Sequence, residues 1–158
     1  KHNLIHFGML ALDSMRLEKN YRSWKSDLTS DYSMLESGLS RWINFNKANF
    51  IGKDSLIKEQ SIGLTKEFVT MILEDPEDNH PFGEAVYLSP VFSNNKYIGP
   101  VVSSGFGHRV NKSIAMAIID RSLINKNDEI HVEVLGRKRK AKIVEKPLYD
   151  PENIQLKS

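Results

Sequence analysis

The sequence predicts an α+β fold in which a helical first third is followed by a small antiparallel β-barrel. Three observations support this prediction. Residues 4–17 are apolar on nearly every side of a helix, short runs of β-branched and aromatic residues follow one another from Leu64 onward, and turn residues separate these runs. With 158 residues, 40% hydrophobic and 27% charged, the chain has the composition of one ordinary globular domain or of a domain with an appendage.

The first predicted element is the helix over residues 4–17. Because apolar side chains surround it, this helix should be buried on all sides, yet the rest of the first third contains too little to enclose it. We therefore expect residues 1–62 to be the end of a larger domain whose beginning precedes Lys1. Within this part, residues 41–45 predict one strand of that domain and residues 53–60 predict a short amphipathic helix.

Residues 63–150 predict a closed antiparallel barrel, and residues 151–158 a tail. Five or six short strands at this spacing, separated by turn residues, are typical of a small barrel. The predicted strands are residues 68–73, 85–88, 97–103, 114–119, 130–135 and 141–144.

The last hairpin is the one for which the sequence predicts a register. A two-residue turn at Gly136-Arg137 would give the ribbon one apolar face and one charged face. The predicted cross-strand pairs are Ile130 with Ile143, Val132 with Ala141, and Glu133 with Lys140.

The composition argues against several classes of protein. No apolar run approaches the roughly 20 residues that span a bilayer, and the pattern of a signal peptide is missing. The chain has no cysteine, which excludes disulfides and thiolate metal sites. A net charge of +2 is too small to indicate a nucleic-acid partner, and the basic cluster at residues 137–142 has no interleaved aromatics. We therefore expect a soluble protein that binds neither a membrane nor a nucleic acid.

No pattern in the chain predicts a catalytic or metal site. A nucleophile elbow, a metal triad and a compact Ser/His/Asp arrangement are all missing. The Gly-rich stretch at residues 102–113 lacks the third glycine of a dinucleotide-binding fingerprint, because Val110 stands there, and an alternating strand pattern follows it. This stretch is better explained as a connection between barrel strands.

Glu18 is the candidate binding residue, because it ends the apolar helix and is followed by Tyr21 and Trp24. A pterin presents a ring N–H and an exocyclic amine side by side, and these two donors match the two oxygens of one carboxylate. A flat aromatic side chain is suited to covering such a ring. From the residues alone, however, an ion pair of Glu18 with a neighbouring Arg or Lys is favoured, and core packing explains the aromatics. The possible ion-pair partners are Arg16, Lys19 and Arg22.

Several blocks resemble the folate-dependent aminomethyltransferase family, which includes the glycine-cleavage T-protein and the C-terminal halves of dimethylglycine and sarcosine dehydrogenases. The resembling blocks are residues 16–20 (R-L-E-x-G), 33–39 (T-P-L-E-A-G-L), 50–56 (F-I-G-[KR]-x-x-L), 104–117 (S-G-x-[GS]-x-x-x-x-K-S-I-A-x-A) and 147–151 (P-x-[FY]-D-P). The K-x-Y-R-x-W form at residues 19–24 looks closer to the dehydrogenase branch than to the T-protein.

The resemblance implies that the cofactor is tetrahydrofolate and that Glu18 contacts its pterin. Trp24 falls where the family has an aromatic near this Glu, and Tyr21 is a weaker candidate for the same site. The family's catalytic Asp lies upstream of this chain, so we expect no catalytic residue here and no activity of the chain alone. FAD would belong to an upstream domain. The implied partners are folate and the missing N-terminal part of the same polypeptide.

Four positions depart from the family pattern. Asn20 and Lys25 stand where Gly is usual, Met34 where Pro is, and Ser37 where Ala is. Asn tolerates the left-handed backbone that Gly allows, but Lys25 would be strained there, so the loop after the helix should differ.

The sequence thus predicts the C-terminal fragment of a tetrahydrofolate-dependent one-carbon transfer enzyme of the dimethylglycine or sarcosine dehydrogenase type. The alternative is a non-catalytic barrel that serves as an interaction or structural module, and an RNA-binding barrel is a third, less favoured reading. The expected location is the cytoplasm in a bacterium or the mitochondrial matrix in a eukaryote. The methyl donor, the oligomeric state and the activity of the parent protein stay open.

Overall fold

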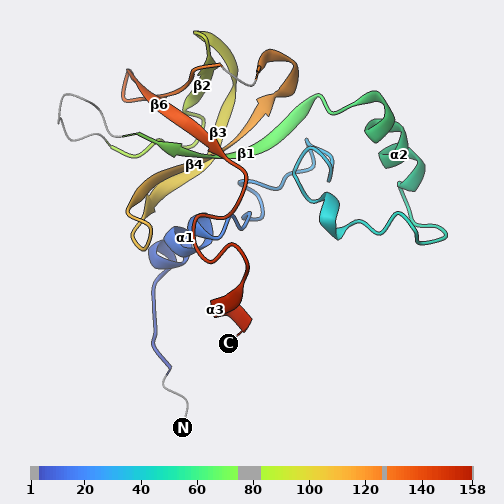
Figure 1. Ribbon diagram of the computed structural model, residues 1–158, viewed down its shortest axis with the longest axis horizontal. Coiled ribbons are helices and arrows are strands. Elements are labelled where there is room, and N and C mark those ends of the chain that lie inside the picture. Colours follow the sequence, from blue (N-terminus) through green and yellow to red (C-terminus); the bar gives the residue numbers. More distant parts are fainter. Residues whose placement is uncertain (1–3, 75–82, 126–127, 158) are drawn as a thin grey trace.

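A closed antiparallel barrel forms the centre of the molecule, and short helices lie outside it (Figure 1). The structure, a computed structural model, describes residues 4–74, 83–125 and 128–157. The strands are β1 (Lys66–Leu73), β2 (Pro90–Ser93), β3 (Lys96–Gly107), β4 (Lys112–Asp120), β5 (Ile130–Val134) and β6 (Arg137–Val144). They pair in the order β1-β4-β3-β2-β5-β6, and β6 closes onto β1. The predicted α+β class with an antiparallel barrel is confirmed.

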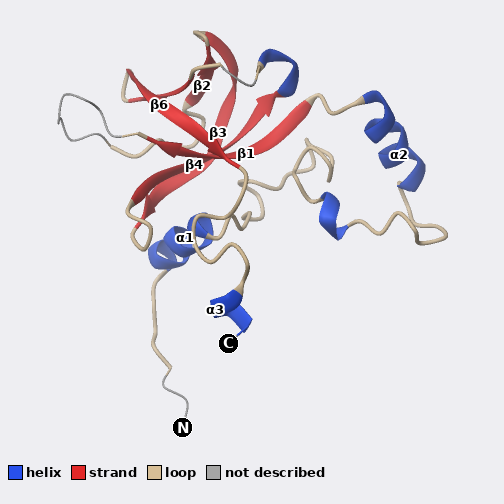
Figure 2. Ribbon diagram, viewed as in Figure 1, coloured by secondary structure: helices blue, strands red, loops and turns tan. Residues whose placement is uncertain are grey.

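The helices are short and belong mainly to the two ends of the chain, as Figure 2 shows. They are α1 (Met9–Glu18), α2 (Lys53–Ile62) and α3 (Ile154–Lys157), with single 3-10 turns η1 (Ser40–Trp42) and η2 (Arg121–Leu123). The predicted helix at residues 53–60 is therefore confirmed as α2. Helix α1 lies against the outside of the barrel, where it contacts β3 and β4.

Strand β4 is buried on both faces, and this explains its continuous apolar sequence. One set of its side chains, including Ala115, Ala117 and Ile119, points into the barrel. The other set, Ile114, Met116 and Ile118, packs outside the barrel with Leu17 of α1. A strand that alternates between two apolar environments needs apolar residues at every position. Strand β4 therefore joins the barrel interior to the layer on which α1 lies.

Helix α1 differs from the prediction in its start and in its burial. It begins at Met9 rather than near residue 4, and of its residues only Leu17 and Glu18 are buried. Its last turn packs on the barrel and Ser14 Oγ donates to the carbonyl oxygen of Phe106 at 2.8 Å, so within this chain alone the helix is not buried on all sides. Several apolar residues before and along the helix are 41% to 87% exposed: Leu4, Ile5, Phe7, Met9, Leu10, Leu12 and Met15.

Two predicted strands are wrong. Residues 85–88 form an irregular segment and a turn, because Leu88 has a positive φ of 68° that breaks an extended chain, and β2 starts only at Pro90. Residues 41–45 contain the end of η1 and no strand. A lone extended segment has no ladder to join there, and an isolated strand is not stable.

The register predicted for the last hairpin is also wrong. Leu135 and Gly136, rather than Gly136-Arg137, form the turn, and both have positive φ values of 50° and 77°. This pair of angles is typical of a type I′ turn, which rarely contains Leu. The observed pairs are Ile130 with Ala141, Val132 with Arg139, and Glu133 with Lys138.

The inner face of this hairpin carries a buried arginine. The predicted and observed registers differ by two residues, so each side chain keeps its face, but Arg139 now pairs with Val132 on the inner face. Its side chain is 4% exposed and donates hydrogen bonds to the carbonyl oxygens of Glu74 and Gly83. A buried guanidinium needs such acceptors, because desolvation is otherwise costly.

The turn assignment can be tested with two substitutions of opposite effect. Gly136→Val should destabilise the chain by about 1 kcal/mol or more, because a β-branched residue resists a positive φ. Open space surrounds Gly136, so a clash does not contribute. Leu135→Asn should instead stabilise by a few tenths of a kcal/mol, since Asn tolerates this backbone region. Thermal melts of the three proteins measure both effects, and equal melting temperatures would reject the turn.

Candidate functional site

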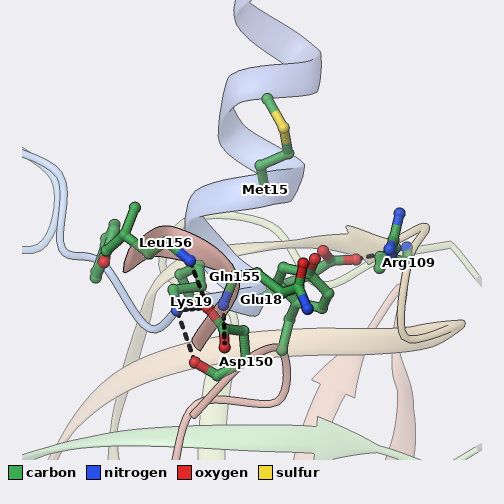
Figure 3. A pocket seen from close by; sticks show the side chains of 9 residues that line it. Met15, Glu18, Lys19, Arg109, Asp150, Gln155 and Leu156 are labelled. Carbon is green, nitrogen blue, oxygen red and sulfur yellow. Dashed lines mark hydrogen bonds and ion pairs between the residues drawn. The ribbon is translucent and has the colours of Figure 1, made fainter. Parts of the chain in front are cut away.

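A cavity of about 380 Å³ lies beside the last turn of α1 (Figure 3). Its walls come from α1 and the loop that follows it, from the β3–β4 turn and from the C-terminal segment of the chain. The lining residues are Met15, Glu18, Lys19, Tyr21, Arg109, Tyr149, Asp150, Gln155 and Leu156. Glu18 therefore lies in a cavity that three distant parts of the sequence build together.

Glu18 is held by backbone rather than by a cation. Its side chain is 3% exposed, and its Oε1 accepts hydrogen bonds from the backbone N–H groups of Arg109 at 2.7 Å and Val110 at 3.3 Å. Among the described residues the ion pair considered from the sequence is not formed: Arg16 pairs with Asp13 and Asp27, Lys19 pairs with Asp150, and the Arg22 guanidinium lies over the Phe68 ring. Among the described residues, the side-chain hydrogen bonds of Glu18 all end on Oε1.

Two glycines of β3 allow α1 to approach the barrel this closely. A Cβ atom at Gly107 would lie 3.0 Å from Cγ of Glu18, and one at Gly105 would lie 3.1 Å from Cδ1 of Leu17. Both distances are shorter than ordinary carbon contacts. Half of the Gly-rich stretch belongs to β3, where its glycines allow close packing, and residues 108–111 form the expected connection to β4.

A buried ion pair fixes the loop after α1. The Arg16 guanidinium donates to Asp27 Oδ2 at 2.7 Å and to Ser103 Oγ of β3 at 2.9 Å. Asp27 is fully buried and also accepts from the backbone N–H of Ser23 at 2.7 Å. These added hydrogen bonds are what makes a buried ion pair tolerable. The sequence analysis missed Asp27, since no local pattern distinguishes it from a surface carboxylate.

The loop brings one of the two candidate aromatics to the cavity. Tyr21 lines it and is 43% exposed, whereas Trp24 is 72% exposed and lies outside the lining. Lys25 has a φ of 75° and Asn20 a φ of 56°. The expectation that Lys25 would avoid the left-handed region is therefore wrong. A backbone hydrogen bond from Lys25 N–H to the carbonyl of Leu28 holds this conformation.

The C-terminal segment was expected to be a tail, but it is fastened to α1. The Lys19 ammonium donates to the backbone oxygen of Asp150 at 2.8 Å, to its carboxylate at 3.2 Å and to Asn153 Oδ1 at 2.7 Å. Burial raises the pKa of Asp150, but hydrogen bonds from backbone N–H groups of α3 and from Lys19 outweigh this effect and leave the pKa lowered. The carboxylate therefore stays charged at neutral pH.

The described residues support neither a metal site nor a membrane-spanning helix. No cluster of three potential His, Cys, Asp or Glu metal ligands occurs among residues 4–74, 83–125 and 128–157. Within the same ranges, every helix falls short of the length and apolar character that crossing a membrane requires.

The lowered pKa of Asp150 predicts a pH-dependent contribution to stability. A carboxyl group whose folded pKa is depressed stabilises the fold above its ordinary pKa of about 3.9 and loses this effect as the pH falls through the lower, folded value. Asp150→Asn should therefore lower the melting temperature at pH ~7, and the difference from wild type should shrink below pH ~4. A difference that does not change with pH would contradict this account of Asp150.

Comparisons with known proteins agree with this geometry. Residues 66–150 match the model of the glycine cleavage T-protein C-terminal barrel domain, and residues 1–47 match that of the GCVT N-terminal domain. Dimethylglycine dehydrogenase, mitochondrial, of Rattus norvegicus is 34% identical over 90% of this chain and 16% of its own length. Sarcosine dehydrogenase, mitochondrial, of Mus musculus is 33% identical over 99% of this chain and 17% of its own length. Aminomethyltransferase of Pseudothermotoga lettingae is 37% identical over 90% of this chain and 37% of its own length.

The fold has a solved counterpart. The crystal structure of glycine cleavage system aminomethyltransferase T from Bartonella henselae superposes with a TM-score of 0.78 at 22% identity, over 91% of this chain and 39% of that one. This chain thus spans between 16% and 39% of the length of these proteins. Because the barrel-domain model matches more than half of the 158 residues, the chain belongs to the family of the glycine cleavage T-protein C-terminal barrel domain.

Proposed function

We propose that this chain is the C-terminal part of a tetrahydrofolate-dependent one-carbon transfer enzyme of the dimethylglycine or sarcosine dehydrogenase type, in which Glu18 binds the pterin. The observation that carries the proposal is the placement of the Glu18 carboxylate. It is buried at the wall of a cavity, and its hydrogen bonds to the described residues use Oε1 alone. The family and its named relatives support the reaction class.

The residues of the cavity fit a folate ring. A volume of about 380 Å³ falls within the range of roughly 300 to 1,000 Å³ that small-molecule sites have. Such sites combine mainly apolar and aromatic walls with a few fixed polar groups. Here Met15, Tyr21, Tyr149 and Leu156 provide the walls, and Glu18 provides an acceptor. Tetrahydrofolate, when bound, would supply the nitrogen atoms that accept the one-carbon unit.

The chain's own contribution is to bind and orient. The backbone N–H groups of Arg109 and Val110 hold the Glu18 carboxylate in one orientation before any ligand arrives, and this avoids reorganisation on binding. Each of the two parallel pterin donors then faces one oxygen of the Glu18 carboxylate. We assign no catalytic residue to this chain, since the family resemblance places the catalytic Asp upstream.

An upstream part of the polypeptide is the second partner in this proposal. The chain covers only 16% to 37% of its dehydrogenase and aminomethyltransferase relatives, and the apolar residues of α1 are exposed. We infer that residues upstream of this chain pack on this helix and carry the catalytic Asp. In the dehydrogenase type, a flavin domain lies further upstream. The mitochondrial matrix or a bacterial cytoplasm is the proposed location.

A second candidate function is a non-catalytic barrel that binds another protein. The exposed apolar face of α1, with Met9 and Leu10 more than 70% exposed, favours it, because patches of this kind often mark interfaces. The two functions differ in a simple observable. A one-carbon transfer enzyme binds tetrahydrofolate with Glu18 as an anchor, whereas a binding module has no affinity for it.

The experiment that tests the proposal replaces Glu18 by Gln in the full-length protein. The amide turns one acceptor into a donor that faces a pterin donor, so tetrahydrofolate affinity should fall by about 2 to 4 kcal/mol, or roughly thirty- to several-hundredfold. Stability should fall by about 1 kcal/mol, because the amide oxygen can still accept from Arg109 and Val110. Titration calorimetry and thermal melts measure the two effects separately.

Glu36 supplies a matched control for this substitution. Its carboxylate also accepts backbone hydrogen bonds, from Ser33 at 3.2 Å and Lys66 at 3.0 Å, and it does not line the cavity. Glu36→Gln should cost similar stability and leave folate affinity unchanged. Equal folate affinity in wild type and Glu18→Gln would mean that Glu18 serves the fold alone, and the folate proposal would lose its main support.

A further inference from the structure

The side of the barrel opposite α1 carries a row of ring side chains on its outer surface. Helix α1 contacts β3 and β4, and in the closed order β1-β4-β3-β2-β5-β6 the strands opposite these two are β6 and β5. Figure 1 shows β2 on the side away from α1. Phe92 of β2 pairs with Tyr97 at the start of β3 and with His131 of β5. Because direct cross-strand partners lie on the same face of a sheet, these three residues form one row across three strands, the ring row.

The ring row points away from the barrel interior. The strand neighbours Val91 and Val132 belong to the apolar core. Successive side chains of a strand point to opposite faces, so Phe92 and His131 point outward. Tyr97 is 53% exposed, and the other two rings are partly exposed. The rings of Tyr97 and Phe92 meet edge to face with their centroids 6.3 Å apart, and such a pair holds both rings in a defined geometry. The row therefore offers preordered aromatic surface.

Lysines of β6 border the ring row. Lys140 is the cross-strand partner of His131. Lys138 places its Nζ 4.7 Å from the centre of the Phe92 ring and donates to Asn95 Oδ1 at 2.7 Å. Both lysines are exposed. The basic cluster of β6 contains no aromatic residue, but the fold supplies aromatic rings to it from β2, β3 and β5. The lack of such rings was one reason why the sequence argued against a nucleic-acid partner.

The acidic residues on this face neutralise the lysines only weakly. Glu129 lies 3.9 Å from Lys140, and both side chains are more than half exposed, so this pair is readily exchanged for another anion. Glu133 is the cross-strand partner of Lys138, with no ion pair between them in the described part of the chain. His131 Nδ1 is buried and has no hydrogen-bond partner among the described residues. The lysines and this ring nitrogen can therefore take a ligand as partner.

We propose that this face of the barrel binds single-stranded nucleic acid, with bases stacked on the ring row and phosphates beside Lys138 and Lys140. Base–aromatic stacking accepts every base, and lysines beside the rings attract the backbone. Aromatic rings on neighbouring strands of a sheet hold about two or three unpaired bases in this way. A duplex keeps its base faces stacked inside, so a single strand is the form that fits. An acidic peptide would satisfy the lysines but would leave the rings unused.

Two tyrosines of similar exposure separate base stacking from general surface effects. In the full-length protein, fluorescence anisotropy with labelled oligouridine and oligothymidine should show binding that weakens as the salt concentration rises. Tyr97→Ala should weaken this binding about fivefold or more, because it removes a base-stacking contact. Tyr87→Ala should leave it unchanged, since Tyr87 is 61% exposed but lies outside the ring row. Melting temperatures of both variants should stay close to that of wild type, because both side chains are exposed.

The lysines give a second readout. Lys140→Gln should reduce the slope of log affinity against log salt concentration by about 1, whereas Tyr97→Ala should leave this slope unchanged. Lys58 of α2 is also exposed and serves as the control, so Lys58→Gln should not change the slope. Tetrahydrofolate should not displace the strand, because the ring row and the Glu18 cavity lie on opposite sides of the barrel.

The proposal is overturned if neither strand binds, if Tyr97→Ala and Tyr87→Ala have equal effects, or if tetrahydrofolate displaces the strand. Polyglutamate is the probe for an acidic protein partner. If it binds as tightly as the two strands and Tyr97→Ala weakens none of them, the face is a docking surface for acidic proteins and the proposal fails. Tighter binding of oligouridine than of oligothymidine would support the proposal with RNA as the ligand, and the reverse would support it with DNA.

Discussion

The packing of the last turn of α1 onto β3 and β4 is the constraint on which the rest of the molecule depends. Leu17 enters the apolar layer outside β4, and Glu18 reaches the backbone N–H groups of the β3–β4 turn. Gly105 and Gly107 favour this approach, because a Cβ atom at either position would lie only 3.1 or 3.0 Å from the side chain of Leu17 or Glu18. One helical turn therefore joins the barrel to the cavity, and a larger residue at either glycine would move Glu18 and the cavity wall together.

Charged groups around this turn are buried in pairs, and each pair ties down a different segment. Arg16 and Asp27 fix the loop that carries Tyr21, and Lys19 and Asp150 fix the C-terminal segment. Removing one partner of a buried pair leaves an uncompensated charge, which destabilises by about 3 to 5 kcal/mol. Such pairs add little net stability over apolar residues, but they specify one arrangement. Specific geometry is what a site that orients a ligand requires.

The parts of the fold that depend on local pattern were predictable, and those that depend on distant contacts were not. Alternating apolar runs predicted the barrel, and the R-L-E block singled out Glu18. The type I′ turn at Leu135-Gly136 was missed because Leu seldom occupies a left-handed position, and the predicted cross-strand pairs were therefore two residues out of register. Asp27 and Asp150 each have partners nearby in sequence, but the contacts that place them in the fold, with Ser103 and Lys19, join distant parts of the chain and leave no local signal.

The interior of the barrel has little room for a ligand, so the groups with binding chemistry lie on its outer surface. Its interior is filled by apolar side chains such as Val91, Val101 and Val132, each with no exposed surface. A small barrel packed in this way is a scaffold. The groups of the proposed folate site lie where α1, the β3–β4 turn and the C-terminal segment meet. The strands position the turn, α1 supplies Glu18 on one side, and the C-terminal segment supplies the wall on the other.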